Sequence, residues 1–219
     1  MTPTGELWRC ERATSAHADG LLALFEGAGS GCFCNYWYFE GDKNAWLERC
    51  YIKPEENRAA LVRRLSSAEL CGVVALSPDQ ASERSERHEA ICGWMNLSRV
   101  GTVPRLYDQR VYRNLPCFQS EPGAREHVYA VACCYVAEAA RGRGVARGLL
   151  SAAIELVRGA GGTAIEAFPR GRPATDSDSA SERLRPDEVW LGPETLFQVA
   201  GFVAVSDFRP YPVLRLHLR

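Results

Sequence analysis

The amino-acid sequence predicts a mixed α/β fold in which helices flank a central mixed β-sheet. Three observations favour this class: a nearly continuous apolar run over residues 128–136, an amphipathic helical pattern over residues 145–157, and a second apolar segment over residues 163–168. A strand, a helix and a strand in this order favour a parallel pair with a crossover helix. The 219 residues show no linker, so we expect one domain over residues 1–219.

The N-terminal part is expected to supply helices and an edge strand. The expected segments are a strand over residues 7–11, a helix that follows Thr14 or Ser15 and ends in the glycine-rich residues 27–31, an aromatic strand or pocket wall over residues 32–39, and a helix that follows Pro54. Glycine tolerates the left-handed conformation that ends many helices, and proline suits the first helical turn.

The middle and C-terminal parts are expected to build the sheet. The expected segments are strands over residues 71–76 and 91–97 around an exposed polar hairpin at 77–89, a short helix over 105–113, a central strand over 128–136, a polar loop over 170–187, a short helix over 193–200 and closing strands over 202–219. The run at 128–136 is apolar throughout, which is typical of a strand buried on both faces.

Composition excludes several classes of protein. Hydrophobic residues make up 46% and charged residues 24%, which is typical of globular chains. The net charge of −1 gives no general attraction to nucleic acid or to an anionic membrane. No apolar run approaches the roughly 18 residues of a membrane-spanning helix, and the first residues do not resemble a secretory leader. The nine cysteines are an odd number, so we expect reduced thiols and a cytoplasmic protein.

Three of these cysteines lie close together near the start of the chain. Cys32, Cys34 and Cys50 do not have the paired spacing of a zinc site, so no metal is predicted. Cysteine is among the most buried residue types, and the three are interpreted as small hydrophobic core residues.

The turn at residues 138–146 carries the strongest functional signal. It precedes an amphipathic helix, and the first N–H groups of a helix lack intrahelical partners and lie at the positive end of its dipole. Glycines let a ligand approach the backbone closely, so a pyrophosphate is the expected ligand. A dinucleotide fingerprint fails because Arg147 stands at the third glycine position, and a nucleotide P-loop fails because no lysine follows.

The same turn satisfies the pattern [Q/R]-x-x-G-x-[G/A] through Arg141, Gly144 and Ala146. At these residues the chain resembles the GNAT superfamily of acetyl-CoA-dependent N-acetyltransferases. The later segment 196–202 is similar to the short helix and Gly-Phe strand start of that family, and the resemblance is strongest over residues 128–202.

The resemblance implies how acetyl-CoA, the acyl donor, would be held. Backbone groups of the turn would bind its pyrophosphate, and the end of the preceding strand would pair with its pantetheine arm. The implied cofactor-binding residues are Cys134, Tyr135, Val136, Arg141, Gly142, Arg143, Gly144, Val145 and Ala146. Arg143 and Arg147 are candidates for charge-assisted contacts to phosphate.

The resemblance also implies direct attack of a neutral amine on the thioester. An N–H near Cys134 or Tyr135 would polarise the acetyl carbonyl. The family often places a proton-donating Tyr where this chain has Phe197, so the usual acid is missing. Glu166, the one ionisable residue of its strand, is the first candidate for a base, against the alternative of an ordinary strand-end glutamate.

Cys134 and Tyr135 are further catalytic candidates, with packing in a buried strand as the alternative. In GNAT-like folds the substrate is usually held by the N-terminal helix region and by loops near the short helix. At those places Tyr36, Trp37 and Trp190 suggest a partly apolar amine or a cation held by ring faces.

The sequence therefore predicts an N-acyltransferase that moves an acetyl group from acetyl-CoA to a primary amine of a small molecule, peptide or protein. The alternative is a non-catalytic acyl-CoA-binding module on the same fold, which the residue Phe197 motivates. The amine, the acyl chain preference and a homodimeric state stay open.

Overall fold

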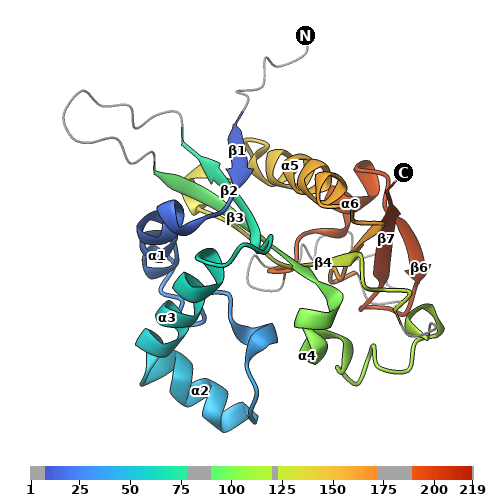
Figure 1. Cartoon of the computed structure of the whole chain (residues 1–219), viewed down its shortest axis with the longest axis horizontal. Coiled ribbons are helices and arrows are strands. Elements are labelled where there is room, and N and C mark those ends of the chain that lie inside the picture. Colours follow the sequence, from blue (N-terminus) through green and yellow to red (C-terminus); the bar gives the residue numbers. More distant parts are fainter. Residues whose placement is uncertain (1–7, 78–89, 120–122, 172–188, 219) are drawn as a thin grey trace, which may run out of the picture.

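The computed structural model describes residues 8–77, 90–119, 123–171 and 189–218, and a seven-stranded sheet lies at its centre (Figure 1). The strands are β1 (Arg9–Arg12), β2 (Gly72–Leu76), β3 (Ile91–Arg99), β4 (Val128–Val136), β5 (Ala164–Ala167), β6 (Val203–Ser206) and β7 (Val213–His217). Their order is β1-β2-β3-β4-β5-β7-β6. Only β4 and β5 pair in parallel among these strands. The predicted fold class and the predicted parallel pair are confirmed.

Helices cover both faces of the sheet (Figure 1). The α-helices are α1 (Ala18–Gly27), α2 (Lys43–Tyr51), α3 (Pro54–Leu65), α4 (Pro104–Tyr107), α5 (Val145–Gly159) and α6 (Glu194–Val199). Short 3₁₀ turns are η1 (Ser15–His17), η2 (Tyr36–Tyr38), η4 (Val100–Thr102), η5 (Pro116–Phe118) and η6 (Glu138–Ala140). None of the helices in the described ranges is long and apolar enough to cross a membrane.

Helix α5 packs on one face because its apolar residues form a single stripe. Val145, Leu149, Ala153 and Val157 recur at helical spacing and are all buried. They join a core cluster that includes Ile165 of β5. The crossover helix predicted from this spacing is confirmed.

The opposite face carries α1 and α3. Leu21 of α1 and Leu61 and Leu65 of α3 are buried against Val74 and Trp94 of the sheet. Helix α3 begins at Pro54, as predicted, with two glutamates in its first turn and two arginines in its last. These charges complement the helix dipole.

The aromatic segment at residues 32–39 is not a strand, which corrects one expectation. Phe33 and Cys34 have φ values of 44° and 57°, and the chain then forms η2. Such positive φ values interrupt an extended strand.

Three further differences have local causes. Helix α2 was not expected, because it buries no side chain and so carries no apolar stripe; Asp42 caps it by accepting from the N–H of Ala45. The helix expected over residues 105–113 is only Pro104–Tyr107. The polar segments expected at 77–89 and 170–187 lie almost wholly outside the described residues.

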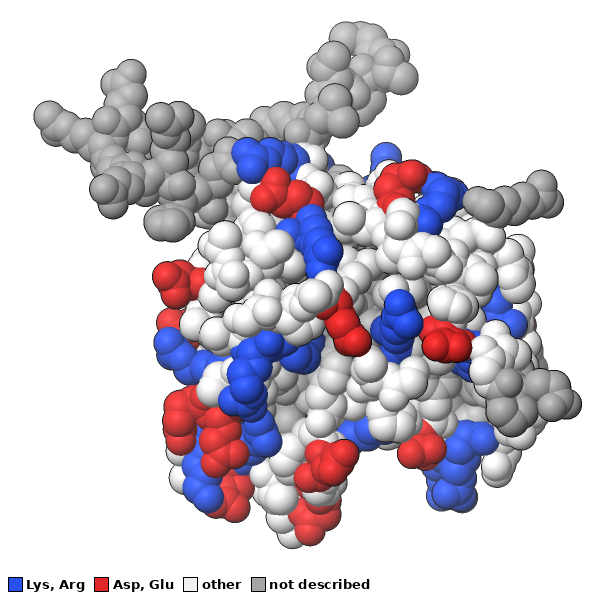
Figure 2. All heavy atoms as spheres, in the orientation of Figure 1, with Lys and Arg blue, Asp and Glu red and all other residues white. Residues whose placement is uncertain are grey.

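Charge is mixed over the molecular surface. Figure 2 shows basic and acidic side chains interspersed over one face, with uncharged residues between them. This distribution follows from 26 basic and 27 acidic residues, and no single-sign field develops over the face shown.

Candidate functional site

The turn between β4 and α5 exposes the N-terminus of a helix. Gly142 and Gly144 have φ values of 74° and 87°, a left-handed conformation that side chains rarely adopt. Gly144 is the N-cap and has no side chain to satisfy the helix. The N–H groups of Arg147 and Gly148 both donate to its carbonyl, at 3.0 and 3.1 Å. The N–H groups of the residues before Arg147 precede the intrahelical ladder and can bind an anion.

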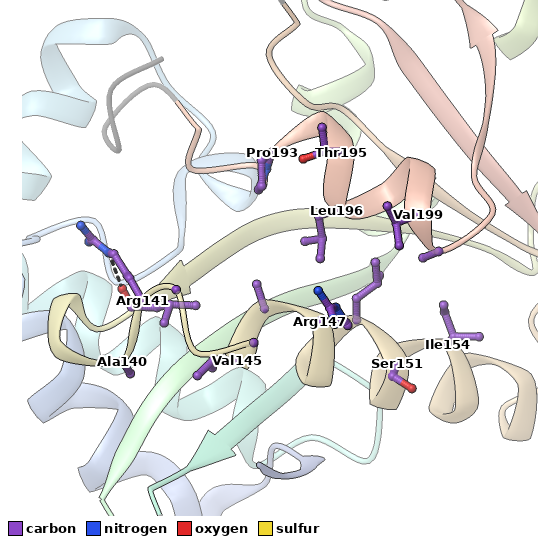
Figure 3. Close-up of a pocket in the computed structure, with 16 residues that line it drawn as sticks. Ala140, Arg141, Val145, Arg147, Ser151, Ile154, Pro193, Thr195, Leu196 and Val199 are labelled. Atoms are coloured by element: carbon purple, nitrogen blue, oxygen red, sulfur yellow. Dashed lines mark hydrogen bonds between the residues drawn. The ribbon is translucent and has the colours of Figure 1, made fainter. Parts of the chain in front are cut away.

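A cleft runs past this turn in two adjoining grooves of about 650 and 930 Å³. The first lies between α5 and α6, and Figure 3 shows Arg147, Ser151, Thr195 and Leu196 facing it. The second lies between the end of β4, α1 and residues 189–193. Residues common to both grooves are Val136, Arg141, Ala146 and Pro193. The turn therefore lies where the two grooves meet.

Strands β4 and β5 separate at the second groove. Their pairing ends at Val131 opposite Ala167, whereas β4 continues to Val136 along β3. A register shift between Asn96 and Leu97 leaves Ala132 as an extra residue on β4. Such a bulge bends a strand. The side chains of residues 133–136 are accordingly half-buried, not fully buried as the apolar run predicts.

The separated edge of β4 makes contacts with parts of the chain far away in sequence. The N–H of Cys134 donates to the carbonyl of Trp190 at 2.7 Å. The carbonyl of Ala132 accepts from Nε1 of Trp37 at 2.9 Å. The carbonyl of Val136 accepts from Nε of Arg141 at 3.0 Å, a bond drawn in Figure 3. Both the Cys134 donor and the Val136 acceptor thus have internal partners.

The three predicted substrate residues lie together. The indoles of Trp37 and Trp190 stack with centroids 5.3 Å apart and planes 17° apart. The ring of Tyr36 meets both edge-on, at 4.6 and 6.2 Å. Trp37 is buried, whereas Trp190 is 39% exposed and lines the second groove. No residue of 32–39 lines either groove, so Trp190 alone joins this cluster to the cleft.

Cys134 and Tyr135 lie at the same edge and both line the second groove. Burial, with the nearby Cys34, raises the pKa of the Cys134 thiol to about 12. Cys134 therefore supplies a neutral thiol and a backbone N–H at neutral pH, and no thiolate nucleophile. The phenol of Tyr135 lies beside the guanidinium of Arg141, 6.0 Å from its ring centroid.

Glu166 lies elsewhere, in a closed ion-pair cluster. Its carboxylate is 0% exposed and lines neither groove. Arg125 donates to both oxygens at 3.0 and 2.7 Å, and Arg215 donates twice to Oε1 at 3.0 and 2.7 Å. The hydroxyl of Tyr107 donates to Oε2 at 2.6 Å. The sequence places a general base beside the slot, but these contacts are those of a structural anion.

Phe197 lies at the position where the family resemblance implies a proton-donating Tyr. Its ring is fully buried and packs edge-on against Phe202 at 5.3 Å. A Cβ on Gly192 would come within 2.9 Å of this ring, so the turn at Gly192 lies directly on it. Phe197 therefore supports the wall of the cleft and has no proton to donate.

The two candidate phosphate arginines differ in position. Arg147 lines the first groove and is exposed. Arg143 lies over the indole of Trp8, 4.9 Å from the ring, and its carbonyl accepts from Nε1 of Trp8 at 2.8 Å. Of these two candidates, Arg147 is the one that faces the cleft.

The resemblance implied a role for the N-terminal helix region, but sequence reasoning named no residue at the end of α1. Ala23, Leu24, Gly27 and Ala28 line the second groove, but small residues at a helix end give no chemical signal in the sequence. The cysteines Cys32, Cys34 and Cys50 lie apart from both groove linings. Within the described ranges no group of three or more His, Cys, Asp or Glu side chains is placed to hold a metal ion.

Comparisons with known proteins found similarity to acetyltransferases. A family model described as "Acetyltransferase (GNAT) family" matches residues 69–184, more than half of the chain. No curated protein matches. A GCN5-related N-acetyltransferase from Kribbella flavida is similar at 16% identity, over 97% of this chain and 98% of that one, with a TM-score of 0.51. The PaiA N-acetyltransferase from Thermoplasma acidophilum, solved with coenzyme A, is 8% identical over 96% and 99%, also with a TM-score of 0.51.

Proposed function

Because the chain belongs to the GNAT family of acetyltransferases, we propose that it transfers the acetyl group of acetyl-CoA to a primary amine by direct attack. The observation that carries the proposal is the exposed helix N-terminus at Gly144, placed where the two grooves meet. A cleft of this shape has room for a long cofactor with a charged middle and a narrow arm.

The turn suits a pyrophosphate in both charge and shape. A Cβ added at Gly142 or at Gly144 would meet no atom within 4 Å, so the surface of the turn is open. We propose that backbone N–H groups of residues 142–146 hold the pyrophosphate and that Arg147 adds a charge-assisted contact, since the N–H of Arg141 donates to the carbonyl of Glu138. The positive end of the α5 dipole favours the same anion.

The edge of β4 suits the pantetheine arm. The N–H of Cys134 and the carbonyl of Val136 face the side from which β5 has separated. We propose that the arm takes over these two groups from Trp190 and Arg141. The N–H of Cys134 would then be available to polarise an acyl carbonyl, as an oxyanion donor does.

The cofactor supplies an activated acyl carbon in its thioester, and the chain supplies orientation and proton transfer. Tyr135 lines the groove beside the Cys134 N–H, so we propose its phenol as the proton donor to the leaving sulfur. The raised pKa of Cys134 supports direct attack over a covalent cysteine intermediate. Glu166 takes no part in this scheme.

We propose that Tyr36, Trp37 and Trp190 form the floor for the acceptor amine. Their rings present faces and edges that suit an apolar group or a cation. The Trp190→Ala variant is expected to raise the KM for the amine about tenfold, with a smaller change in kcat, because binding contacts are lost. Steady-state kinetics against a panel of amines measures this change. An unchanged KM for every accepted amine would show that Trp190 does not bind the amine.

Acetyl-CoA binding is expected to change tryptophan fluorescence, because it would displace the Trp190 carbonyl and disturb the stack on Trp37. Titration with coenzyme A should give a saturable signal in the wild type that Trp190→Phe strongly reduces. Trp46→Phe is the matched control, since Trp46 is not part of that stack and its loss should leave the signal. Equal signals from all three proteins would show that the Trp190 segment stays in place.

The direct test is release of free coenzyme A on addition of an amine, after calorimetric titration has shown acetyl-CoA binding. Release that requires the amine supports the transferase. Binding without amine-dependent release over a broad panel would favour the non-catalytic acyl-CoA module, which the buried Phe197 motivates.

We further propose that the 219 residues act as one unit in the cytoplasm. All nine cysteines are free thiols, which suits a reducing compartment. Mixed surface charge supports a small amine or peptide as substrate over nucleic acid.

A further inference from the structure

Cys34 lies in a strained turn between the sheet and helix α3. Its backbone φ of 57° is in the left-handed region, and its side chain is 7% exposed. Backbone strain of this kind in a residue other than glycine persists where the surroundings hold it in place. Neither groove of the cleft includes Cys34.

A hydrogen-bond donor contacts the sulfur of Cys34. Nδ2 of Asn96 donates to it at 3.2 Å. The orientation of this amide is set from its other side, because Oδ1 of Asn96 accepts from the hydroxyls of Tyr38 and Ser98, each at 2.8 Å. The nitrogen of Asn96 must therefore face the sulfur.

Two more groups of the sheet lie in the core cluster of Cys34. Asn96 and Cys133 are directly opposite each other in the β3–β4 register, so both side chains project toward the turn of Cys34. Cys133 packs against the core cluster that contains Cys34. The fully buried Nε1 of Trp94 lies in the same core cluster and has no hydrogen-bond partner among the described residues.

A positive charge completes the surroundings. Nη2 of Arg64 donates to the carbonyl of Cys34 at 3.1 Å, and its guanidinium lies 4.0 Å from the centre of the Tyr38 ring. Nε and Nη1 of Arg64 are buried and have no hydrogen-bond partner in the described part of the chain. A buried cation with unpartnered N–H groups is costly unless an anion lies close by. A thiolate at Cys34 is an anion in that position.

We propose that Cys34 is a nucleophilic thiolate, and that Cys34 and Cys133 form a dithiol which peroxide oxidises to a disulfide. The geometry supplies a hydrogen-bond donor and a neighbouring cation for the thiolate, and a second thiol packed against the same core cluster. The proposal concerns a modification site and does not rest on the acetyl transfer.

The pKa values of the two thiols differ in the sense that this chemistry needs. Burial alone would raise the pKa of Cys34, but the neighbouring Cys133 thiol and the charge of Arg64 lower it to about 7. The pKa of Cys133 is raised well above its usual value, because it neighbours Cys34 and because it is buried. The other titratable groups that interact with Cys34 are Cys32, Tyr38, Cys71 and Cys134. The pKa of each of these is raised, so Cys34 is the thiolate of the cluster.

The oxidation balances in two steps. The Cys34 thiolate attacks one oxygen of hydrogen peroxide, the O–O bond breaks, and Cys34 becomes a sulfenic acid with release of hydroxide. The Cys133 thiol loses its proton to that hydroxide and attacks the Cys34 sulfur, and a second hydroxide leaves and takes up a proton as water. Overall, two thiols and one peroxide give one disulfide and two waters.

The first experiment measures how fast iodoacetamide alkylates each cysteine of the native wild-type protein between pH 5.5 and 9, by peptide mass spectrometry. Burial slows alkylation at every pH alike, so the midpoint of the pH profile reports ionisation independently of access. The rate at Cys34 is expected to fall about tenfold per unit below pH 7 and to level off above pH 8. Cys10, whose pKa burial raises to about 11, should keep rising through the whole range. A Cys34 profile that still rises at pH 9 would overturn the thiolate.

The second experiment treats the reduced full-length protein with hydrogen peroxide and maps disulfides after blocking with N-ethylmaleimide. The wild type should give a Cys34–Cys133 link, and Cys133→Ser should give a Cys34 sulfenic acid that dimedone traps. Cys71→Ser is the matched control, because Cys71 is a buried neighbour with a raised pKa and its loss should leave the link intact. If no link involving Cys34 forms, or if other cysteines are oxidised first, the dithiol assignment fails.

Discussion

Replacement of Gly144 by glutamate is expected to weaken acetyl-CoA binding at least about 100-fold, which corresponds to about 2.7 kcal/mol. Two effects act together. A side chain at a φ of 87° costs roughly 1–2 kcal/mol, which is relieved by distorting the turn. The new carboxylate also lies at the helix N-terminus, where it would take the place of the phosphates and repel them. Isothermal calorimetry with acetyl-CoA measures the change.

Gly161→Glu provides the matched control at the other end of the same helix. Gly161 has a φ of 73°, and a Cβ there would meet nothing within 4 Å, just as at Gly144. Both variants therefore bear the same kind of backbone strain, but only Gly144 faces the cleft. We expect Gly161→Glu to bind acetyl-CoA as the wild type does. Equal losses in the two variants would show that general destabilisation is responsible, and full binding by Gly144→Glu would remove the turn from the site.

Replacement of Glu166 by glutamine is expected to lower the free energy of unfolding by about 3–5 kcal/mol. Among the described residues, the substitution removes the negative charge that Arg125 and Arg215 share, and it leaves both cations without that ion pair. Glutamine keeps the size of the side chain, so the loss reports charge and not a cavity. Urea denaturation followed by circular dichroism measures the change.

The control for this prediction is Glu155→Gln on the exposed side of α5. Glu155 pairs with Arg158 at the surface, and such pairs contribute at most about 1 kcal/mol. The two variants also separate a structural role from a catalytic one. If Glu166→Gln unfolded like the wild type but lost amine-dependent turnover, Glu166 would have to be reinstated as a base.

Much of the fold could be predicted because its elements carry strong local patterns. The run of nine apolar residues at Val128–Val136 marked β4 to the residue, and the stripe from Val145 to Val157 marked α5. Elements with no buried face gave no such pattern. Helix α2 buries nothing, and the turn at Phe33 and Cys34 is held by contacts with distant residues.

The candidate site also has a part that could be predicted from the sequence and a part that could not. The phosphate-binding turn was predictable because the glycines that permit it and the helix that polarises it are neighbours in sequence. The role of Glu166 was not, because its partners Tyr107, Arg125 and Arg215 come from three other segments. An apolar strand with one glutamate looks the same whether that glutamate faces a substrate or two arginines.

By itself, the sequence determined the fold class, the family resemblance and the turn for the cofactor, since each depends on residues within one strand–turn–helix unit. Only the tertiary structure decided which polar groups are already engaged. It brought Trp190 to the N–H of Cys134, two arginines to Glu166, and Asn96, Cys133 and Arg64 to Cys34. The physical reason is that hydrogen bonds and ion pairs are short-ranged in space but not in sequence. The chemistry of a buried polar group depends on those partners, and the order of residues along the chain does not reveal them.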